Sequence, residues 1–113
     1  MICIKDKGLL TVIINHCLRI EEKTKNLSKE EFINDEDVKD IVCFNILQIG
    51  ELAKNFSDEL ISRYKNVPWK QIKGMRDRIV HRYDSIDFNR IWLIVTEDIK
   101  PLHHYCIEIL NNN

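Results

Sequence analysis

Hydrophobic residues along this chain recur with the spacing of α-helices, without the alternation typical of β-strands. The first such stretch runs from about Lys7 to Lys25, and its apolar residues form a single helical stripe. The second runs from about Asp35 to Asn55, and its apolar positions cover more than one face. A helix of that kind usually buries two sides. We therefore expect one side of the second helix to meet the core and the other to be available to a second subunit.

Shorter elements are predicted in the second half of the chain. Ser57 is expected to cap a short helix that ends near residue 64, and a third main helix is expected from about Trp69 to Val80. The last main helix follows the loop at residues 84–87 and runs to about Leu110. Pro101 lies inside it and predicts a kink, because proline removes one backbone donor and crowds the preceding turn.

Together these elements predict an all-α fold, an antiparallel four-helix bundle with an additional short helix. A chain of 113 residues is long enough for one hydrophobic core and short for two, so residues 1–113 are expected to form a single domain. Ser28 and Glu31 have the spacing of a capping box, which predicts a helical turn after the first main helix. Gly50 and Gly74 fall inside predicted helices, and close helix packing is the expected reason for both.

The composition agrees with a globular helical protein. Hydrophobic residues make up 44% and charged residues 31% of the chain, with 3 glycines and 2 prolines. No apolar run approaches the roughly 20 residues that cross a bilayer, and no secretory signal is recognisable. We therefore expect a cytoplasmic protein without membrane contact. The four cysteines form no C-x-x-C pair, which favours buried reduced thiols over a zinc or redox site.

Charge is distributed unevenly, although the formal net charge is only −1. Residues 28–59 contain three lysines against nine acidic residues, and residues 63–82 contain seven basic residues against one acidic residue. The basic segment includes Lys73, Arg76, Arg78 and Arg82. It either meets phosphate groups or forms a solvated helix face that pairs with the acidic segment, and charge alone does not decide between these interpretations.

Arg76 is the unusual residue of the predicted third helix. At about 100° per residue, the apolar arc of that helix has Arg76 in its middle. A guanidinium there is costly unless it is paired or faces a wet cleft. His81 follows about 140° further around, so the two side chains converge only if the helix ends near Val80 or if a second subunit completes a cleft.

An arginine and a histidine that converge on a basic cleft suit the cleavage of RNA. A neutral imidazole can take the proton of a ribose 2′-hydroxyl, and a guanidinium can stabilise charge that develops on the phosphoryl oxygens. Such internal transesterification needs no metal and no cofactor. From spacing alone a structural interpretation stays open, in which His81 caps the helix end and Arg76 is a buried partner of Glu51 or another acid.

Several other residues have side chains that could act as ligands, but structural roles explain them better. His103 and His104 are adjacent on the last helix and point about 100° apart, so we expect them to be exposed or interfacial and not metal ligands. Trp69 and Trp92 are expected to pack in the core and not to stack on bases. His16 is expected to be a hydrogen-bonded residue at the border of the first helix's apolar stripe.

The order of motifs resembles that of HepT-like HEPN proteins. Arg76-x4-His81-x-Tyr83 is similar to the R-x4-H-x-Y signature of that family. Further similarities follow in order: Ile49-Gly50-Glu51, Pro68-Trp69, Gly74-Met75-Arg76, Ile86-Asp87, Ile91-Trp92, and Asp98 followed by Pro101-Leu102. The resemblance covers about residues 35–110. Asp77 departs mildly, since it stands where the family accepts Asn or another polar residue.

That resemblance implies a homodimer whose two motif copies face a shared cleft. It implies a metal-independent endoribonuclease, the toxin of a type II HEPN/MNT toxin–antitoxin pair, with Arg76 and His81 catalytic and Asp77 in support. Lys73, Arg78 and Arg82 of the basic segment are then candidates for RNA binding.

The resemblance also implies a partner and a modification. The partner is an MNT-type nucleotidyltransferase antitoxin, which can silence the toxin by attaching AMP to Tyr83. The alternative from another functional class is a non-catalytic helical dimer that binds a nucleotide or a partner protein.

Overall fold

The computed structural model describes residues 1–80 and 85–113. Their secondary structure is helical, in the order α1 (Ile4–Thr24), α2 (Lys29–Ile33), α3 (Glu36–Ala53), α4 (Asp58–Arg63), α5 (Trp69–Lys73), α6 (Met75–Ile79), α7 (Phe88–Glu97) and α8 (Ile99–Asn111). Within the described ranges, the one β-type pairing is an isolated antiparallel bridge between Val80 and Ile86. The all-α prediction is confirmed.

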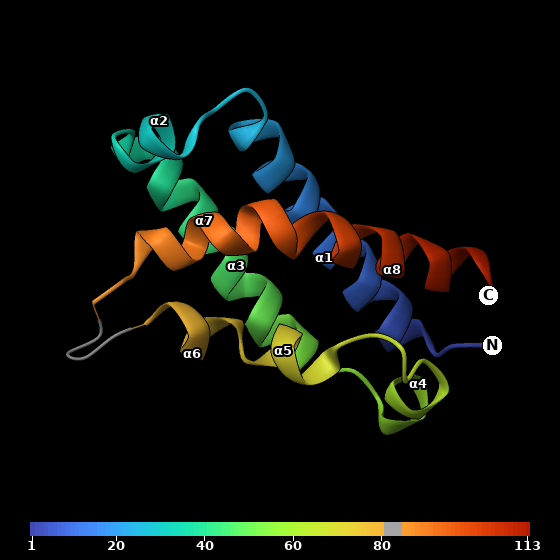
Figure 1. Ribbon diagram of the computed structural model, residues 1–113. Helices are drawn as coiled ribbons and strands as arrows, with labels where there is room; N and C mark the ends of the chain where they lie inside the picture. Colours follow the sequence, from blue (N-terminus) through green and yellow to red (C-terminus); the bar gives the residue numbers. More distant parts are fainter. Residues whose placement is uncertain (81–84) are drawn as a thin grey trace.

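The helices pack as a bundle around α1 and α3 (Figure 1). These two helices run antiparallel, and α1 packs against α8 as well as α3. The α5–α6 segment packs against α3, while α7 and α8 follow one another across α3 and α1 (Figure 1). The core consists mainly of aliphatic side chains from these helices, among them Leu10, Ile13, Ile20, Val42, Ile46, Ile49, Ile79, Ile91, Ile94, Ile99 and Leu102.

Helix starts follow the polar residues that the sequence offers as caps. The Ser28 hydroxyl accepts the Glu31 N–H at 3.1 Å, and the Glu31 carboxylate accepts the Ser28 N–H at 2.9 Å, which confirms the capping box. Ser57 caps α4 as predicted, since its hydroxyl accepts the Leu60 N–H at 3.1 Å. The first helix begins at Ile4, earlier than the hydrophobic pattern predicts.

A buried carboxylate joins α1 to the start of α4. Asp6 is 1% exposed, and it accepts hydrogen bonds from the backbone N–H of Ser57 at 3.0 Å and from the Ser57 hydroxyl at 2.5 Å. Burial raises the pKa of Asp6, but the hydrogen bonds from Ser57 outweigh it, and the net pKa lies below its ordinary value. The carboxylate is therefore charged in the folded protein at neutral pH.

The prediction of one continuous helix from Trp69 to Val80 is wrong. The segment is divided at Gly74, which has φ −91° and ψ 13° and lies between α5 and α6. A Cβ at Gly74 would lie 3.3 Å from the carbonyl oxygen of Lys70, in the preceding turn of the same segment. Gly74 is therefore needed for a tight local turn. The expectation that it allows another helix to pack closely is wrong.

The last main helix is also divided, at a point that the proline explains. The Pro101 ring has no N–H to donate to the carbonyl of Glu97 and crowds that carbonyl. The helix is interrupted at Asp98, whose φ of −107° and ψ of −33° stay in the right-handed helical region, so α7 ends at Glu97 and α8 begins at Ile99. The expected disturbance is confirmed, and it lies just before Pro101.

Both tryptophans are structural, as expected. Trp69 is 7% exposed, and its indole N–H donates to the carbonyl of Tyr64 at 2.9 Å. The Trp92 ring packs on the Phe32 ring with centroids 5.1 Å apart. Neither ring is therefore presented to solvent as a platform for a base.

The histidines of the described residues also have structural explanations. The His16 Nδ1 atom lies 2.7 Å from the Asn45 side-chain oxygen, which confirms a hydrogen-bonded border residue. The His103 Nδ1 atom lies 2.7 Å from a Glu21 carboxylate oxygen and so joins α8 to α1. His104 is exposed.

The cysteines are free thiols, as predicted, but Cys3 is exposed and not buried. Cys17 and Cys106 are buried, and burial raises the pKa of the Cys106 thiol to about 12. Cys43 is half-buried, and burial raises its pKa as well. Such thiols are protonated at neutral pH and pack as small apolar groups. Within the same described ranges, no helix combines the length and the apolar character that crossing a bilayer requires.

Candidate active site

The residues expected to carry chemistry begin on α6 and continue beyond its end. α6 ends at Ile79, and Val80 follows in an extended conformation with φ −95° and ψ 127°. The helix thus stops at the place that convergence of Arg76 and His81 requires. Arg76 to Val80 lie within the described residues, whereas positions 81–84, and with them His81, Arg82 and Tyr83, lie outside.

Arg76 is exposed, whereas Met75 and Ile79 on the same short helix are buried. The expected position of Arg76 in the middle of the apolar arc is therefore wrong, because the break at Gly74 gives α6 a helical phase of its own. An exposed side chain excludes the structural interpretation in which Arg76 is a buried partner of Glu51. It agrees with the other option, a guanidinium that faces a wet surface.

A glycine on α3 allows α6 to approach closely from behind. A Cβ at Gly50 would lie 3.5 Å from the Cβ of Met75, 3.6 Å from the carbonyl oxygen of Ile72 and 3.7 Å from the backbone nitrogen of Arg76. The expected close packing at Gly50 is thus confirmed. Because α3 supports the backbone of α6 directly, the position of Arg76 is set by the core.

The basic residues near α6 differ in their surroundings. Lys73 is half-buried at the end of α5, and Asp77 is exposed beside Arg76. The Arg78 guanidinium donates to the Asp98 carboxylate at 2.6 Å, which ties α6 to the junction of α7 and α8. The sequence contains no local signal for that pair, since its members are far apart along the chain. RNA binding by Lys73, Arg78 and Arg82 stays a prediction.

The chain returns to α6 directly after the part that is outside the described residues. Val80 and Ile86 form the antiparallel bridge, and the Asp87 N–H donates to the carbonyl of Ile79 at 2.7 Å. The side chain of Asp87 then caps α7 by accepting the N–H groups of the two residues Asn89 and Arg90 at 3.0 and 3.2 Å. The segment that carries the rest of the motif therefore begins and ends at the same end of α6.

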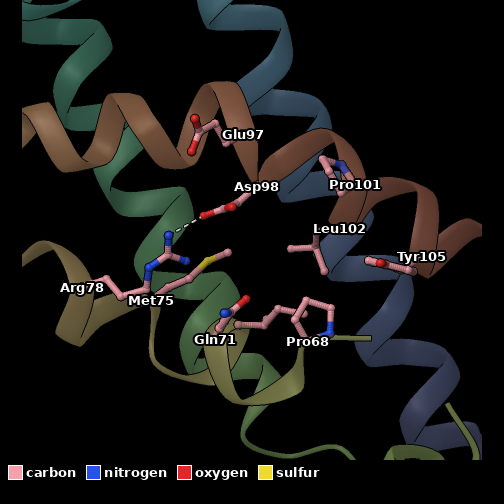
Figure 2. A pocket seen from close by; sticks show the side chains of 10 residues that line it. Pro68, Gln71, Met75, Arg78, Glu97, Asp98, Pro101, Leu102 and Tyr105 are labelled. Carbon is pink, nitrogen blue, oxygen red and sulfur yellow. Dashed lines mark hydrogen bonds and ion pairs between the residues drawn. The ribbon is translucent and has the colours of Figure 1, made fainter. Parts of the chain in front are cut away.

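A small hollow lies between the α5–α6 segment and the α7–α8 junction (Figure 2). Its lining comprises Pro68, Gln71, Ile72, Met75, Arg78, Glu97, Asp98, Pro101, Leu102 and Tyr105. Its volume of about 100 Å³ is well below the roughly 300 Å³ at which ligand pockets begin. Two carboxylates, Glu97 and Asp98, line the hollow, and its one arginine, Arg78, is already paired with Asp98. The hollow is therefore unsuited to binding a phosphate group, which is itself negatively charged. The surface around Arg76, and not this hollow, is the candidate site.

The chemistry expected of the candidate site from the sequence requires one cation, Arg76, and one imidazole, His81. Within residues 1–80 and 85–113, no group of three or more His, Cys, Asp or Glu side chains is arranged to hold a metal ion. The candidate residue that α6 presents to solvent is Arg76, and Asp77 beside it is exposed as well. A guanidinium in that position can bind a phosphate oxygen and stabilise charge on it.

Comparison with known proteins identifies a family. The model of the family described as ribonuclease HepT-like matches residues 13–109. The "Putative RNase TTE0752" of Caldanaerobacter subterraneus subsp. tengcongensis is 33% identical over 98 residues, which cover 87% of this chain and 88% of that protein. The "Probable ribonuclease HepT" of Thermococcus cleftensis is 32% identical over 83 residues, covering 74% of this chain and 76% of that protein. No solved structure matches the chain.

Proposed function

The chain belongs to the HepT-like ribonuclease family, and we propose that it cleaves RNA by internal transesterification at a site formed by Arg76 and His81. The observation that carries the proposal is the end of α6. That helix presents Arg76 to solvent and stops at Ile79, so the chain leaves helical geometry before it reaches His81. On a continuing helix the two side chains would point about 140° apart.

The proposed reaction needs one proton acceptor and one fixed positive charge. His81, as a neutral imidazole, accepts the proton of a ribose 2′-hydroxyl. The 2′-oxygen forms a bond to the adjacent phosphorus, and the bond from phosphorus to the 5′-oxygen of the next nucleotide breaks. The products are a 2′,3′-cyclic phosphate and a 5′-hydroxyl, whose oxygen takes up a proton. Arg76 stabilises the charge on the non-bridging oxygens, and Asp77 supports its orientation.

We propose that the active form is a homodimer and that α1 and α3 provide its interface. Phe44 of α3 is 56% exposed, so an interface over it would remove apolar surface from water. It lines an open hollow with Ile41 and His16, and the side chain of Val12 on α1 is 42% exposed. This outward apolar side of α3 is what the sequence pattern predicts for a helix buried on two sides.

We further propose that the chain is the toxin of a toxin–antitoxin pair, with an MNT-type nucleotidyltransferase as antitoxin. Family membership and the match of the motif support this proposal. Tyr83 is the proposed site of modification. Attack of its hydroxyl oxygen on the α-phosphorus of ATP would join AMP to the ring and release pyrophosphate. The added phosphodiester is anionic and bulky, so it would repel RNA phosphates and obstruct the site.

The function is tested with purified protein and RNA of defined sequence. Wild-type protein should release fragments with 2′,3′-cyclic phosphate and 5′-hydroxyl ends in the presence of EDTA. Arg76→Ala and His81→Ala should each abolish cleavage while the circular dichroism spectrum stays that of wild type. Full activity in both variants would show that the site is assigned wrongly. Saturable nucleotide binding without cleavage of any RNA would instead favour the non-catalytic binding dimer.

A further inference from the structure

We propose that Arg90 of α7 is a positioning residue for the ribonuclease motif, acting through Asp87 and the backbone of Arg78. The proposal rests on the function proposed above. It concerns the two ends of the segment that carries His81 and Tyr83, both of which lie within the described residues. Arg90 touches neither the motif residues of the described part nor, in this proposal, the substrate.

One guanidinium joins the last turn of α6 to the first turn of α7. The Arg90 Nε atom lies 3.4 Å from a carboxylate oxygen of Asp87. Another nitrogen of the same guanidinium donates to the backbone carbonyl of Arg78 at 3.3 Å. The planar fork of an arginine can serve a carboxylate and a carbonyl at once, which a lysine cannot do in the same way.

These interactions act on groups that α6 itself leaves without partners. The last four carbonyls of a helix lack intrahelical donors. Arg90 supplies a donor for the carbonyl of Arg78, and the Asp87 backbone supplies one for the carbonyl of Ile79 at 2.7 Å. Asp87 therefore contacts the end of α6 through its backbone N–H. Its side-chain carboxylate contacts Arg90. This arrangement, which we call the 87–90 clamp, sets the spacing between the two ends of residues 80–86.

The clamp is expected to affect catalysis more than stability. Arg90 is 55% exposed at its side chain, and exposed ion pairs contribute little to folding. Catalysis is more sensitive to small displacements than folding stability is, since a displacement of about 1 Å at a reacting group can lower a rate roughly a hundredfold. The ion pair of Arg78 with Asp98 also holds α6, so removing Arg90 should loosen the end of the helix without releasing the helix.

The test compares Arg90→Ala with Arg90→Lys and with a matched control. Lys54→Ala removes an ion pair of the same i,i+3 type, with Glu51 at 3.0 Å and a similarly exposed cation, at the C-terminal end of α3. We expect Arg90→Ala to lower kcat by about tenfold to a hundredfold, with KM and Tm close to wild type. Arg90→Lys should recover part of the activity, and Lys54→Ala should behave as wild type.

A second variant separates the ion pair from the helix cap. Asp87→Asn keeps a side-chain oxygen that can accept the N–H groups at the start of α7 but removes the charge that meets Arg90. We expect it to lower kcat in the same direction as Arg90→Ala, with helix content unchanged. An unchanged kcat in both Arg90→Ala and Asp87→Asn would overturn the proposal. A decrease of kcat in Arg90→Ala that is no larger than the decrease in the control Lys54→Ala would overturn it as well.

Amide hydrogen exchange gives a readout that does not depend on RNA cleavage. In Arg90→Ala the Asp87 amide, which donates to Ile79, should exchange faster, while amides in the middle of α1 and α3 keep wild-type rates. That result supports the clamp even if wild-type protein cleaves no RNA, in which case the proposed function alone fails. An Asp87 amide that exchanges at the wild-type rate in Arg90→Ala would overturn the clamp.

Discussion

At the scale of single residues, Gly50 lies where α6 packs closely on α3. A Cβ there would meet Met75 and its neighbours at 3.5–3.7 Å, which is ordinary van der Waals contact. Gly50→Ala should therefore be neutral or stabilise the protein by up to about 1 kcal/mol, because alanine favours the helix. Gly50→Leu should destabilise by about 1–3 kcal/mol through overpacking. Urea unfolding of both variants checks this, and equal stabilities would contradict the close packing.

Asp6 provides a prediction about pH. Its pKa is lower in the folded protein than in the unfolded chain, so its contribution to stability is present above the unfolded value of 3.8 and is lost as pH falls through the folded value. Asp6→Asn should therefore be less stable than wild type at pH 7, and the difference should shrink below about pH 4. Urea unfolding of both proteins between pH 3 and pH 7 measures it. A difference that does not vary with pH would contradict a stabilising charge on Asp6.

Individual side chains are predictable from the sequence to different degrees. His16 is predicted correctly because it lies beside an apolar stripe, and Trp69 is predicted correctly because it occupies an apolar helical position. The exposure of Arg76 is not predicted, because a helical wheel assumes one continuous phase from Trp69 onward. The pairing of Arg78 with Asp98 cannot be predicted either, since it depends on how distant helices meet.

At the scale of elements, the Arg78–Asp98 ion pair connects α6 to the α7–α8 junction. Both side chains are partly exposed, at 40% and 32%, so their coupling should be about 1 kcal/mol or less. The ion pair gives Arg78 a structural role that competes with the RNA binding predicted from the sequence. If that role is the only one, Arg78→Ala and Asp98→Ala should lower stability by similar amounts and leave the salt dependence of RNA binding unchanged.

Fluorescence anisotropy with labelled RNA at several salt concentrations tests this expectation. For each phosphate of a single strand that the protein ceases to neutralise, the slope of log K against log salt changes by about 0.7. A change of that size in Arg78→Ala would show that Arg78 meets the RNA backbone directly, as the sequence predicts. Urea unfolding of the two single variants and the double variant supplies the coupling energy.

Helix positions are predicted well from the sequence and helix continuity less well. The caps at Ser28, Ser57 and Asp87 are local signals, and a single sequence contains them in full. The break at Gly74 is not such a signal, because a glycine within an apolar helical pattern is often tolerated. The disturbance of the last helix is predicted correctly from Pro101, and the interruption lies three residues before it, at Asp98.

At the scale of the whole molecule, the exposed apolar side of α3 predicts self-association. Phe44→Glu should convert the protein to a monomer, because a carboxylate would be buried at the proposed interface. Leu93→Glu is a matched control on α7, since Leu93 is 52% exposed and Phe44 is 56% exposed. Sedimentation velocity over a range of concentrations distinguishes the two variants. A dimeric Phe44→Glu protein would place the interface on another face.

The overall fold is predictable because four apolar helical patterns with short connections leave few alternatives. The site is predictable only in part. The motif residues are close in sequence, so Arg76 and His81 can be proposed from the resemblance to the family without any structure. How the ends of their segment are fastened depends on Arg90, which approaches from the next helix.

The packing of α1 against α8 has a consequence during synthesis on the ribosome. The first helix emerges long before the last, and until α8 has been translated the apolar side of α1 lacks one of its two main neighbours. A nascent chain that stops before residue 99 would therefore lack a closed core, and proteases could degrade it. Premature termination should consequently yield no folded fragment of this protein.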